Sequence, residues 1–586
     1  MQIYKFLEVL TGSQKKKMIL LFFFMVFVTF IELFSIASIL PIFSAILSSD
    51  YIIKINSLLS KLQFVDYSFQ NHEDLVVFSL VFLFSIFTLK NFFLLFFNWF
   101  QQNFCRELTN HLSNSLFNIF INQPYKYYFN AKHSELVRNI NGEPVNLVRN
   151  ILIPINLIVM ESIILLGLIF FLIILYGKNI GFALFGAVVV ISTMLYISRN
   201  IIKKWGTKRF EYEGNRIKTI SQSFDSIKDI ILGKKNNFFF SKFKNFTYLT
   251  NEASMYGAFY RSLPKIIIEQ LVIILFIIFF FYNYNPQDLN PAFYSKLIFF
   301  GAILIRLIPS FIRISISYQS IRLATTPQEK IYKFLQLNKS ISHEKKNQIE
   351  FKKSIKFKNI NYNFEGYKNN VLENISLEIE KNQTVGIIGQ TGSGKTTFLD
   401  IFLGLLQPSS GSIFIDDKDF TYSLDAVNWQ NKIGYVSQNV ILMDDTIKNN
   451  IALGIEESLI DLGSIDNAIN KANLREFINS LPNGIDTNVG EKGVKLSGGQ
   501  IQRIGIARAL YFDPDILCLD EATSSLDYNT ENEVLKTIVS LKKNKTVLII
   551  AHRLKTIENC DKIIELRNGK INKITTPKEM FENVKQ

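Results

Sequence analysis

Cysteine and charge are both scarce in this sequence. Its three cysteines, Cys105, Cys518 and Cys560, lie far apart, and no two of them form a C-x-x-C pair. This spacing indicates neither a disulfide framework nor a zinc site, so each cysteine is expected to be a small buried apolar residue. Only 19% of the residues are charged whereas 48% are hydrophobic, which is an apolar composition for a soluble protein.

No cleavable signal peptide is apparent in the N-terminal region. Lys15, Lys16 and Lys17 precede an apolar stretch that continues to about Leu47. The stretch is far longer than the core of a signal peptide and has no obvious small-residue cleavage site. It is therefore predicted to be a first membrane helix with a cytoplasmic N-terminus.

Long apolar runs fill the first part of the chain. A spanning helix needs about 20 mostly apolar residues. Six stretches qualify, at about 18–46, 75–99, 150–176, 179–201, 264–284 and 292–318. We expect a six-helix membrane domain at residues 1–325, a linker at 326–350, and a soluble α/β domain at 351–586.

The net charge of +14 fits either nucleic-acid binding or a membrane protein with basic cytoplasmic loops. Lys and Arg are concentrated in the segments 100–149 and 202–263, and the connections at 177–178 and 285–291 are short with a single Lys. Because basic loops favour the cytoplasm, both long loops and both termini are expected inside. We therefore favour a lipid-bilayer partner and expect no nucleic acid.

The connection at 48–69 is longer than the other outer turns. It places Lys54, Ser57 and Lys61 between isoleucines and leucines. This pattern predicts an amphipathic helix that lies on the outer membrane surface. A loop that packs on neighbouring helices is the alternative.

Ionisable residues within or at the edges of the predicted spans are candidates for function, because charge inside a membrane is costly. They are Glu32, Lys90, Glu161, Lys265, Glu269, Arg306 and Arg313. Arg306 and Arg313 are about two helical turns apart and so share a face. Two guanidinium groups suit a phosphate-bearing substrate. An Arg–Glu pair inside the bundle, or snorkelling to the interface, is the alternative.

A phosphate-binding motif follows the apolar run Thr384–Gly389, which is predicted to be a buried strand. The motif fits G-x-x-x-x-G-K-[ST] and consists of Gly389, Gln390, Thr391, Gly392, Ser393, Gly394, Lys395, Thr396 and Thr397. Its glycines allow backbone N–H groups to surround phosphate oxygens, and the following helix N-terminus adds a favourable dipole. Lys395 is expected to reach the β- and γ-phosphates, and Thr396 to bind Mg²⁺.

Acidic residues end a second apolar strand, Ile516–Leu519. Asp520 is placed to hold the Mg²⁺ shell, and Glu521 to orient or deprotonate the attacking water. His552 follows the apolar run "TVLII" and falls where α/β sheets place their ligands, so it is a candidate for contact with the γ-phosphate.

The segment "LSGGQ", Leu496 to Gln500, is similar to the signature of the ABC transporters, and residues 351–586 resemble an ABC nucleotide-binding domain. This resemblance implies ATP and Mg²⁺ as ligands and a catalytic set of Glu521, His552 and Gln438. It also implies that Gln438 contacts Mg²⁺, that Phe364 stacks on adenine and that Asp527 ends the D-loop. In this family, the signature Ser497, Gly498, Gly499 and Gln500 cap the ATP of the other subunit. The chain is therefore expected to act as a homodimer or with a similar chain.

The first part of the chain resembles the six-helix membrane domain of ABC exporters (type IV, also called type I), with coupling regions at Tyr127–Pro144 and Phe224–Asn236. The chain most resembles PglK-type and Wzk-type flippases of lipid-linked oligosaccharides, which are related to lipid A flippases. The features behind this are the stretch at about 50–64 and the basic residues Lys90, Lys265, Arg306 and Arg313. The resemblance implies ATP-driven movement of a polyprenyl-pyrophosphate-linked oligosaccharide to the outer leaflet of a bacterial inner membrane. Its use is then protein N-glycosylation or surface glycan assembly.

Other functions share part of this pattern. An exporter of drugs or other lipids would have the same ATPase motifs. A peptide exporter with a processing protease is disfavoured, because fewer than 20 residues precede the first span. Six spans argue against a soluble ABC ATPase acting on DNA. An ATP-gated channel or regulatory subunit often has a weakened ATP site, whereas every catalytic position here holds a competent residue.

Overall fold

The chain divides into two compact units. The structure, a computed structural model, describes residues 10–47, 51–59, 69–176, 178–283, 291–323, 332–335, 349–364, 366, 369–522, 528–542, 544–551 and 553–584. The first unit comprises 1–123 and 130–341, and the second comprises 124–129 and 342–586. The short segment Pro124–Phe129 thus belongs to the second unit, although it lies between membrane helices in the sequence.

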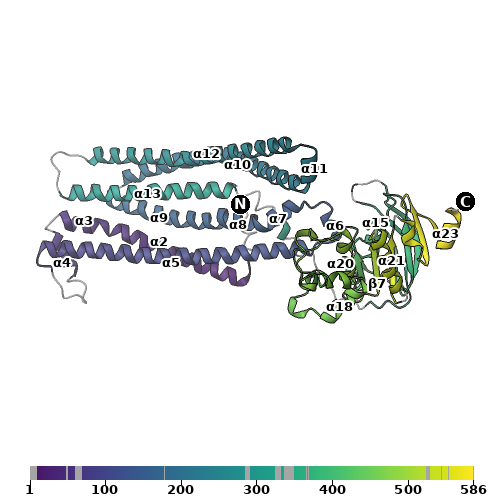
Figure 1. Ribbon diagram of the computed structural model, residues 1–586. Coiled ribbons are helices and arrows are strands. Elements are labelled where there is room, and N and C mark those ends of the chain that lie inside the picture. The colour runs from purple at the N-terminus through teal and green to yellow at the C-terminus, as the bar shows by residue number, and fades with distance from the viewer. Residues whose placement is uncertain are drawn as a thin grey trace. The chain divides into compact units, whose positions relative to one another are not determined.

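The described residues of the first unit form long helices (Figure 1). They are α2 (Gly12–Ala37), α3 (Ile39–Leu47), α4 (Tyr51–Leu59), α5 (His72–Ile121), α7 (His133–Asn141), α8 (Glu143–Leu147), a π-helical turn (Val148–Leu152), α9 (Ile153–Tyr176), α10 (Lys178–Asp225), α11 (Ile227–Leu232), α12 (Asn236–Asn283) and α13 (Pro291–Leu323). Much of the two long inner loops expected from the sequence is therefore a continuation of α5, α10 and α12.

Five helical stretches among the described residues are long and apolar enough to cross a membrane. They are Gly12–Ile46, His72–Ile121, Glu143–Ile174, Asn236–Phe281 and Leu297–Arg322. Each overlaps one of the six predicted spans. The remaining span, at 179–201, lies in α10, whose backbone is helical there. Most side chains of that part fall outside the described residues, so this span stays a prediction.

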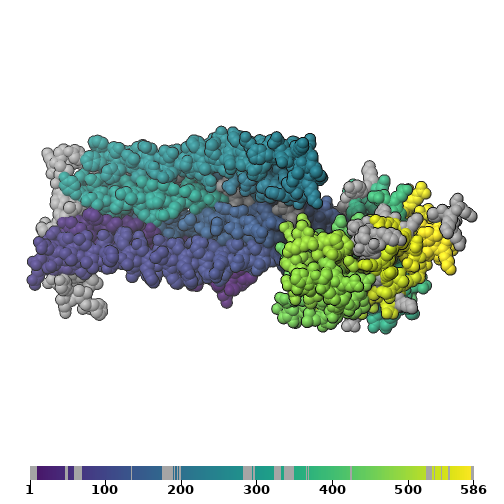
Figure 2. All heavy atoms as spheres, in the orientation of Figure 1, coloured from purple at the N-terminus to yellow at the C-terminus, as the bar shows by residue number. Residues whose placement is uncertain are grey.

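The packing of the first unit is typical of a membrane protein. Helix α9 packs against both α2 and α13, whereas α5 exposes large apolar side chains such as Phe84 (72% exposed) and Leu95 (69%). The surface of α5 forms the blue-purple band in the space-filling view (Figure 2). Lipid tails are as apolar as these side chains, so such exposure has no hydrophobic cost in a bilayer.

Only part of the expected amphipathic stretch is described, since residues 48–50 and 60–68 lie outside the described ranges. In the described part, α4 packs Tyr51, Ile52 and Ile55 against a small core around Leu75. The Asn56 side chain both donates to the Phe69 carbonyl (2.9 Å) and accepts from the Phe69 N–H (3.0 Å). This face of α4 is thus covered by protein, which agrees with the alternative of a segment packed on its neighbours.

The second unit contains two sheets and surrounding helices (Figure 1). The strands are β1 (Ser354–Tyr362), β2 (Leu372–Glu380), β3 (Thr384–Ile388), β4 (Ser410–Ile415), β5 (Lys418–Asp419), β6 (Ile433–Val436), β7 (Ile516–Asp520), β8 (Thr546–Ile550), β9 (Lys562–Arg567) and β10 (Lys570–Thr575). The α-helices are α6 (Tyr125–Tyr128), α15 (Lys395–Phe402), α16 (Tyr422–Gln430), α17 (Ile447–Ile451), α18 (Leu462–Lys471), α19 (Arg475–Asn479), α20 (Gly498–Leu510), α21 (Tyr528–Leu541), α22 (Leu554–Ile557) and α23 (Pro577–Val584). The larger sheet has the order β10-β9-β3-β8-β7-β6, and the smaller has the order β2-β1-β4-β5.

The larger sheet is parallel except for β10. Strands β3, β6, β7, β8 and β9 pair in parallel, and β10 joins β9 in an antiparallel arrangement. All five residues of β7 and all five of β8 are buried, which explains why these strands read as continuous apolar runs. Hydrophobic clusters cover both faces of this sheet, so the polar residues that follow the strands sit on a rigid support.

Candidate functional site

The carboxyl edge of the parallel sheet brings the predicted nucleotide-binding residues together. The phosphate-binding loop follows β3, Asp520 and Glu521 end β7, and Gln438 follows the neighbouring β6. Parallel sheets place ligands at this edge. His552, which follows β8, and Asp527 lie outside the described residues, so their roles stay predictions.

The phosphate-binding loop depends on its glycines. Gly392 and Gly394 have φ of 82° and 98°, a region that other residues rarely adopt. A Cβ on Gly389 would lie 2.3 Å from the Leu566 carbonyl oxygen, so no side chain fits there. The glycines therefore allow both the turn of the loop and its close packing on β9.

The loop presents polar groups suited to phosphate oxygens. The Lys395 ammonium donates to the carbonyls of Gly389 (2.8 Å) and Gln390 (3.1 Å). Burial lowers its pKa, while the carboxylates of Glu521 and Asp520 act in the opposite direction. The Ser393 hydroxyl oxygen is buried with no hydrogen-bond partner among the described residues. An oxyanion within this loop would satisfy Ser393 and the N–H groups of the helix N-terminus, so the residues present fit nucleotide phosphates.

Two neighbouring carboxylates end β7. Asp520 is 8% exposed, and burial together with the charge of Glu521 raises its pKa, against the effects of Tyr435 and Lys395. Glu521 has φ of 48°, and its N–H donates to the Ile550 carbonyl of β8 (3.0 Å). This left-handed turn directs the Glu521 side chain away from the direction of the strand. The Gln438 Nε2 donates to the Glu521 Oε2 (2.8 Å), which joins two predicted catalytic residues.

The oxygen donors at this edge fit Mg²⁺. The Thr396 hydroxyl, the Gln438 carboxamide and the Asp520 carboxylate are all hard oxygen ligands. No group of three or more His, Cys, Asp or Glu side chains that could hold a metal occurs in the described part of the chain. Mg²⁺ usually binds through one or two protein ligands together with substrate phosphates and waters.

Two residues near Asp520 were not predicted from the sequence. The Tyr435 hydroxyl on β6 donates to the Asp520 Oδ2 (3.4 Å). Asp400 lies on α15, and burial together with the charge of Asp520 raises its pKa to about 6. No sequence signal marks either residue, because both belong to ordinary elements and acquire their environment only in the folded domain.

The signature residues cap the helix α20. Ser497 is the N-cap, and its hydroxyl accepts from the Gln500 N–H (3.3 Å) while the Gln500 side chain accepts from the Ser497 N–H (2.9 Å). Ser497 and Gly498 are exposed, so the helix N-terminus is open to an anion. Among the described residues, no hydrogen bond or ion pair joins the signature to the phosphate-binding loop of the same chain.

Comparison with protein families gives a match within the second unit. Residues 372–524 match the family described as "ABC transporter". The second unit, which contains these residues, is similar to an ABC transporter ATPase domain, and we call it the ABC ATPase domain. The match supports ATP hydrolysis, with ATP as the nucleotide that the phosphate-binding loop receives.

Curated relatives match different shares of the chain. The "ATP-dependent lipid A-core flippase" of Nitrosococcus oceani is 45% identical over 218 residues, which cover 37% of this chain and 36% of the relative. The "ABC transporter B family member 1" of Dictyostelium discoideum is 30% identical over 485 residues, covering 82% of this chain and 52% of the relative. The chain thus spans between about a third and half of the length of these curated relatives.

The fold of the whole chain is similar to that of a solved exporter. A structure described as "Structure of a bacterial Atm1-family ABC exporter with ATP bound" aligns with a TM-score of 0.79 at 20% sequence identity, and it covers 98% of this chain and 97% of the other. The predicted fold class is therefore confirmed, with a helical membrane domain that has several apolar helices and an ABC ATPase domain.

The segment Pro124–Phe129 adds an aromatic contact to the ABC ATPase domain. The Phe129 ring packs edge-on against Phe364 with centroids 5.6 Å apart, and Phe364 also contacts Tyr362 at 5.1 Å. Phe364 is the residue predicted to stack on adenine. Phe129 therefore supports the ring on which the base is expected to rest.

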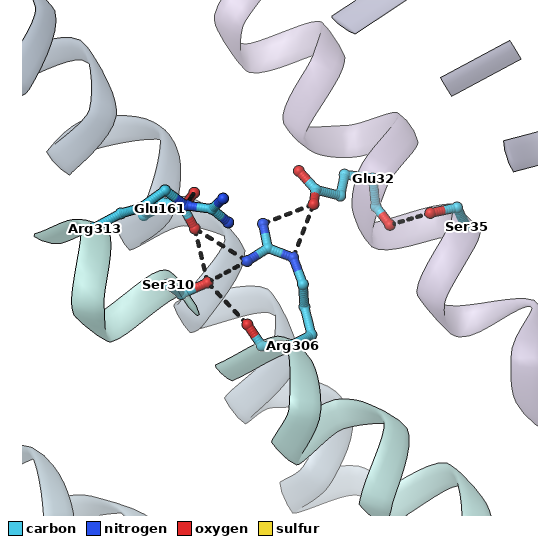
Figure 3. Close-up of polar contacts among 6 residues, drawn as sticks. All are labelled: Glu32, Ser35, Glu161, Arg306, Ser310 and Arg313. Carbon is cyan, nitrogen blue, oxygen red and sulfur yellow. Dashed lines mark hydrogen bonds and ion pairs between the residues drawn. The ribbon is translucent and has the colours of Figure 1, made fainter. Parts of the chain in front are cut away.

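The predicted substrate residues separate into two groups in the membrane unit. Arg306 and Arg313 on α13 lie together with glutamates from α2 and α9 (Figure 3). Lys90 on α5 instead lies over the ring of Phe87 at 4.5 Å. Lys265 on α12 pairs at 3.8 Å with Glu269 of its own helix. No ion pair among the described residues joins either lysine to the two arginines.

Proposed function

We propose that this chain is one half of an exporter that couples ATP hydrolysis to the movement of a phosphate-bearing lipid across a membrane. The ABC ATPase domain, the apolar helices of the first unit and the whole-chain similarity to an exporter fold support this proposal. The observation that carries the substrate class is Arg313, a guanidinium that is 43% exposed within an apolar helix long enough to span a membrane.

Each residue of the ATP site has a distinct task. Lys395 and the loop N–H groups hold the phosphates. Thr396, Asp520 and Gln438 would hold Mg²⁺ through oxygen atoms, and the bound ion would supply positive charge beside the phosphate oxygens. Glu521 orients the attacking water and accepts its proton. Its hydrogen bond to Gln438 fixes the carboxylate before the water arrives.

The functional unit is a dimer in this proposal. Ser497, Gly498 and Gly499, with Gln500, form an exposed helix N-terminus that does not contact its own phosphate-binding loop through any described bond. A second copy, or a similar chain, would bring such an N-terminus to each ATP. His552 and Asp527 complete the proposed ATP site as the γ-phosphate contact and the D-loop aspartate.

The proposed substrate is a polyprenyl-pyrophosphate-linked oligosaccharide, for protein N-glycosylation or surface glycan assembly. Guanidinium groups bind phosphate oxygens in pairs, and intramembrane charges commonly mark a substrate pathway. Relatives named "ATP-dependent lipid A-core flippase" act on lipid A-core by their name, which supports a lipid substrate. Lys90 and Lys265 are proposed as further basic contacts for the same head group.

The proposed location is the cytoplasmic membrane of a bacterium, with both termini on the cytoplasmic side. Lys and Arg in the segments 100–149 and 202–263 support this orientation, because basic segments near spans stay inside. The substrate would then move from the cytoplasmic leaflet to the outer leaflet.

The test is translocation in proteoliposomes. Purified chain receives a polyprenyl-pyrophosphate oligosaccharide and ATP, and glycan accessibility from one side is followed over time. We expect ATP-dependent loss of accessibility that is absent with the Glu521→Gln variant, which keeps the shape of the site but lacks the base. Robust ATP hydrolysis without translocation would contradict the proposed substrate class.

Export of another lipid, a drug or a peptide is the second candidate. It is favoured by the charge balance around the two arginines, since Glu32 and Glu161 pair with them. A cluster neutralised in this way has no net charge to attract an anion. In that case, uncharged substrates would stimulate ATP hydrolysis to the same extent as pyrophosphate lipids.

A further inference from the structure

Four charged side chains form a network of ion pairs between three membrane helices (Figure 3). Glu32 belongs to α2, Glu161 to α9, and Arg306 and Arg313 to α13. Ser310 lies on the same face of α13 and joins the network. The sequence predicted that the two arginines share a face, but the structure gives them different surroundings.

Arg306 is fully engaged. Its Nε and Nη2 contact the Glu32 Oε1 at 2.8 and 2.6 Å. Its Nη1 contacts the Glu161 Oε2 at 3.3 Å and the Ser310 hydroxyl at 2.6 Å. The side chain is only 15% exposed. All three guanidinium nitrogens are thus used to tie α13 to α2 and α9, which leaves no edge for a substrate.

Arg313 is held at one point. Its Nε lies 2.5 Å from the Glu161 Oε1, and its side chain is 43% exposed. This contact is an ion pair without hydrogen-bond geometry, and no hydrogen bond or second ion pair links Arg313 to a residue that the structure describes. A guanidinium has two hydrogen-bonding edges, so the edge formed by Nη1 and Nη2 can receive an anion while Glu161 keeps the Nε.

Glu161 connects the two arginines. Its side chain is 0% exposed and lies in the apolar helix α9. One carboxylate oxygen serves Arg313, and the other serves Arg306 and accepts from Ser310 at 2.7 Å. A buried carboxylate needs such compensation. The ion pair places the Arg313 Nε beside Glu161 without hydrogen-bond geometry. The bonds of the other carboxylate oxygen to Arg306 and Ser310 hold Glu161 in place.

An exposed guanidinium within a membrane span needs an anion, water or a polar surface. Arg313 is seven residues after Arg306, so their backbones are about 10 Å apart along the helix, although both guanidinium groups reach Glu161. The Arg313 edge formed by Nη1 and Nη2 takes no part in the Arg306 tie. The geometry therefore allows head-group binding at Arg313 without dismantling the links between the three helices.

We propose that Glu161 is a positioning residue that orients Arg313 for contact with the phosphate of the substrate, whereas Arg306 is a structural tie. This inference rests on the proposed function and divides the work between two arginines that the sequence could not distinguish. It predicts that Glu161 affects head-group recognition through Arg313, and that Glu32 affects only the packing of the helices.

The experiment compares two lipids that share a tail. Undecaprenyl pyrophosphate and undecaprenol are added to the full-length chain in nanodiscs, and the concentration that gives half-maximal stimulation of ATP hydrolysis is measured for each. Their ratio is the head-group preference. The variants are Arg313→Gln, Arg306→Gln, Glu161→Gln and Glu161→Asp, with Glu32→Gln as the matched control.

We expect Arg313→Gln to reduce the head-group preference about ten- to a hundredfold, the range of a charge-assisted hydrogen-bond pair. Glu161→Gln should reduce it about three- to tenfold, with partial recovery in Glu161→Asp. Arg306→Gln and Glu32→Gln should leave the preference within about twofold and instead lower the thermal unfolding midpoint. An equal loss in Glu32→Gln and Glu161→Gln, or a larger loss in Arg306→Gln than in Arg313→Gln, would overturn the inference.

A double variant covers the possibility that Glu161→Gln folds poorly. Glu161→Gln with Arg313→Gln removes one charge of each sign and leaves the pair of Arg306 and Glu32. If Glu161 acts through Arg313, the double variant should show the same preference as Arg313→Gln alone, and a further tenfold loss would contradict this. A wild-type chain without preference for the pyrophosphate would instead refute the proposed function. Failure of the proposed function can therefore be told apart from failure of the inference about Glu161.

Discussion

Asp400 gives a pH-dependent prediction for the ABC ATPase domain. Burial and the charge of Asp520 raise its pKa from 3.8 to about 6. The folded domain therefore binds this proton more tightly than the unfolded chain does. The associated stability is fully present below pH 3.8 and is lost as the pH rises through about 6. At pH 7.5 the buried ionised carboxylate lowers the free energy of unfolding, and Asp400→Asn removes this charge.

The magnitude follows from the shift. About two pKa units correspond to about 3 kcal/mol, and solvent screening of this partly exposed group lowers the figure to about 1–2 kcal/mol. For a domain of this size that is about 2–8 °C in the unfolding midpoint. Asp400→Asn should therefore raise the midpoint at pH 7.5, and the gain should shrink as the pH approaches 4.5.

The assay is differential scanning calorimetry of the full-length chain in detergent, at one scan rate and without Mg²⁺ or nucleotide. Asp444→Asn, which removes an aspartate at an exposed position, is the control for net charge. A gain that is the same at every pH, or a loss of stability at pH 7.5, would refute the reasoning from Asp400.

Three further predictions use other parts of the structure. Glu521→Gln should bind ATP with nearly unchanged affinity and release phosphate about 10²–10⁴-fold more slowly, and turnover above a tenth of the wild-type rate would exclude Glu521 as the base. A Cβ on Gly167 would lie 2.6 Å from a leucine side chain of α2, whereas one on Gly257 meets nothing within 4 Å. Gly167→Ala should therefore destabilise the membrane unit by about 1–3 kcal/mol, with Gly257→Ala as the matched control in thermal unfolding. Phe129→Ala should raise the Kd for ATP about two- to tenfold, because it removes an edge-to-face contact with Phe364 worth about 0.5–1.5 kcal/mol. Equilibrium binding of ATP measures this, and an unchanged Kd would show that Phe364 needs no such support.

The ATP site was predictable because its residues lie in short local motifs. The glycines and Lys395 are specified by one loop, and Asp520 and Glu521 by the end of one strand. Parallel pairing then brings them to the same edge of the sheet. Tyr435 and Asp400 were not predictable, since their importance arises from burial next to Asp520 rather than from a pattern.

Helical periodicity did not predict the ion pairs between the two glutamates and the two arginines of the membrane unit. The seven-residue spacing placed Arg306 and Arg313 on one face of α13, and the ionisable Glu32 and Glu161 were candidates from the sequence. The pairing itself joins residues more than a hundred positions apart on three helices. No local pattern records such contacts, so the sequence left an Arg–Glu pair and an anion site as open alternatives.

The course of the chain also affects how the ATPase domain can be isolated. The chain enters the second unit at Pro124, leaves it after Phe129 and returns near residue 342. A fragment that begins at residue 342 lacks Phe129, so one side of the Phe364 ring is uncovered. Exchange of ATPase domains between related proteins faces the same requirement. The graft must match the aromatic residues of Pro124–Phe129 as well as the junction near residue 342, or the transplanted domain lacks the ring contact to Phe364, the residue predicted to stack on adenine.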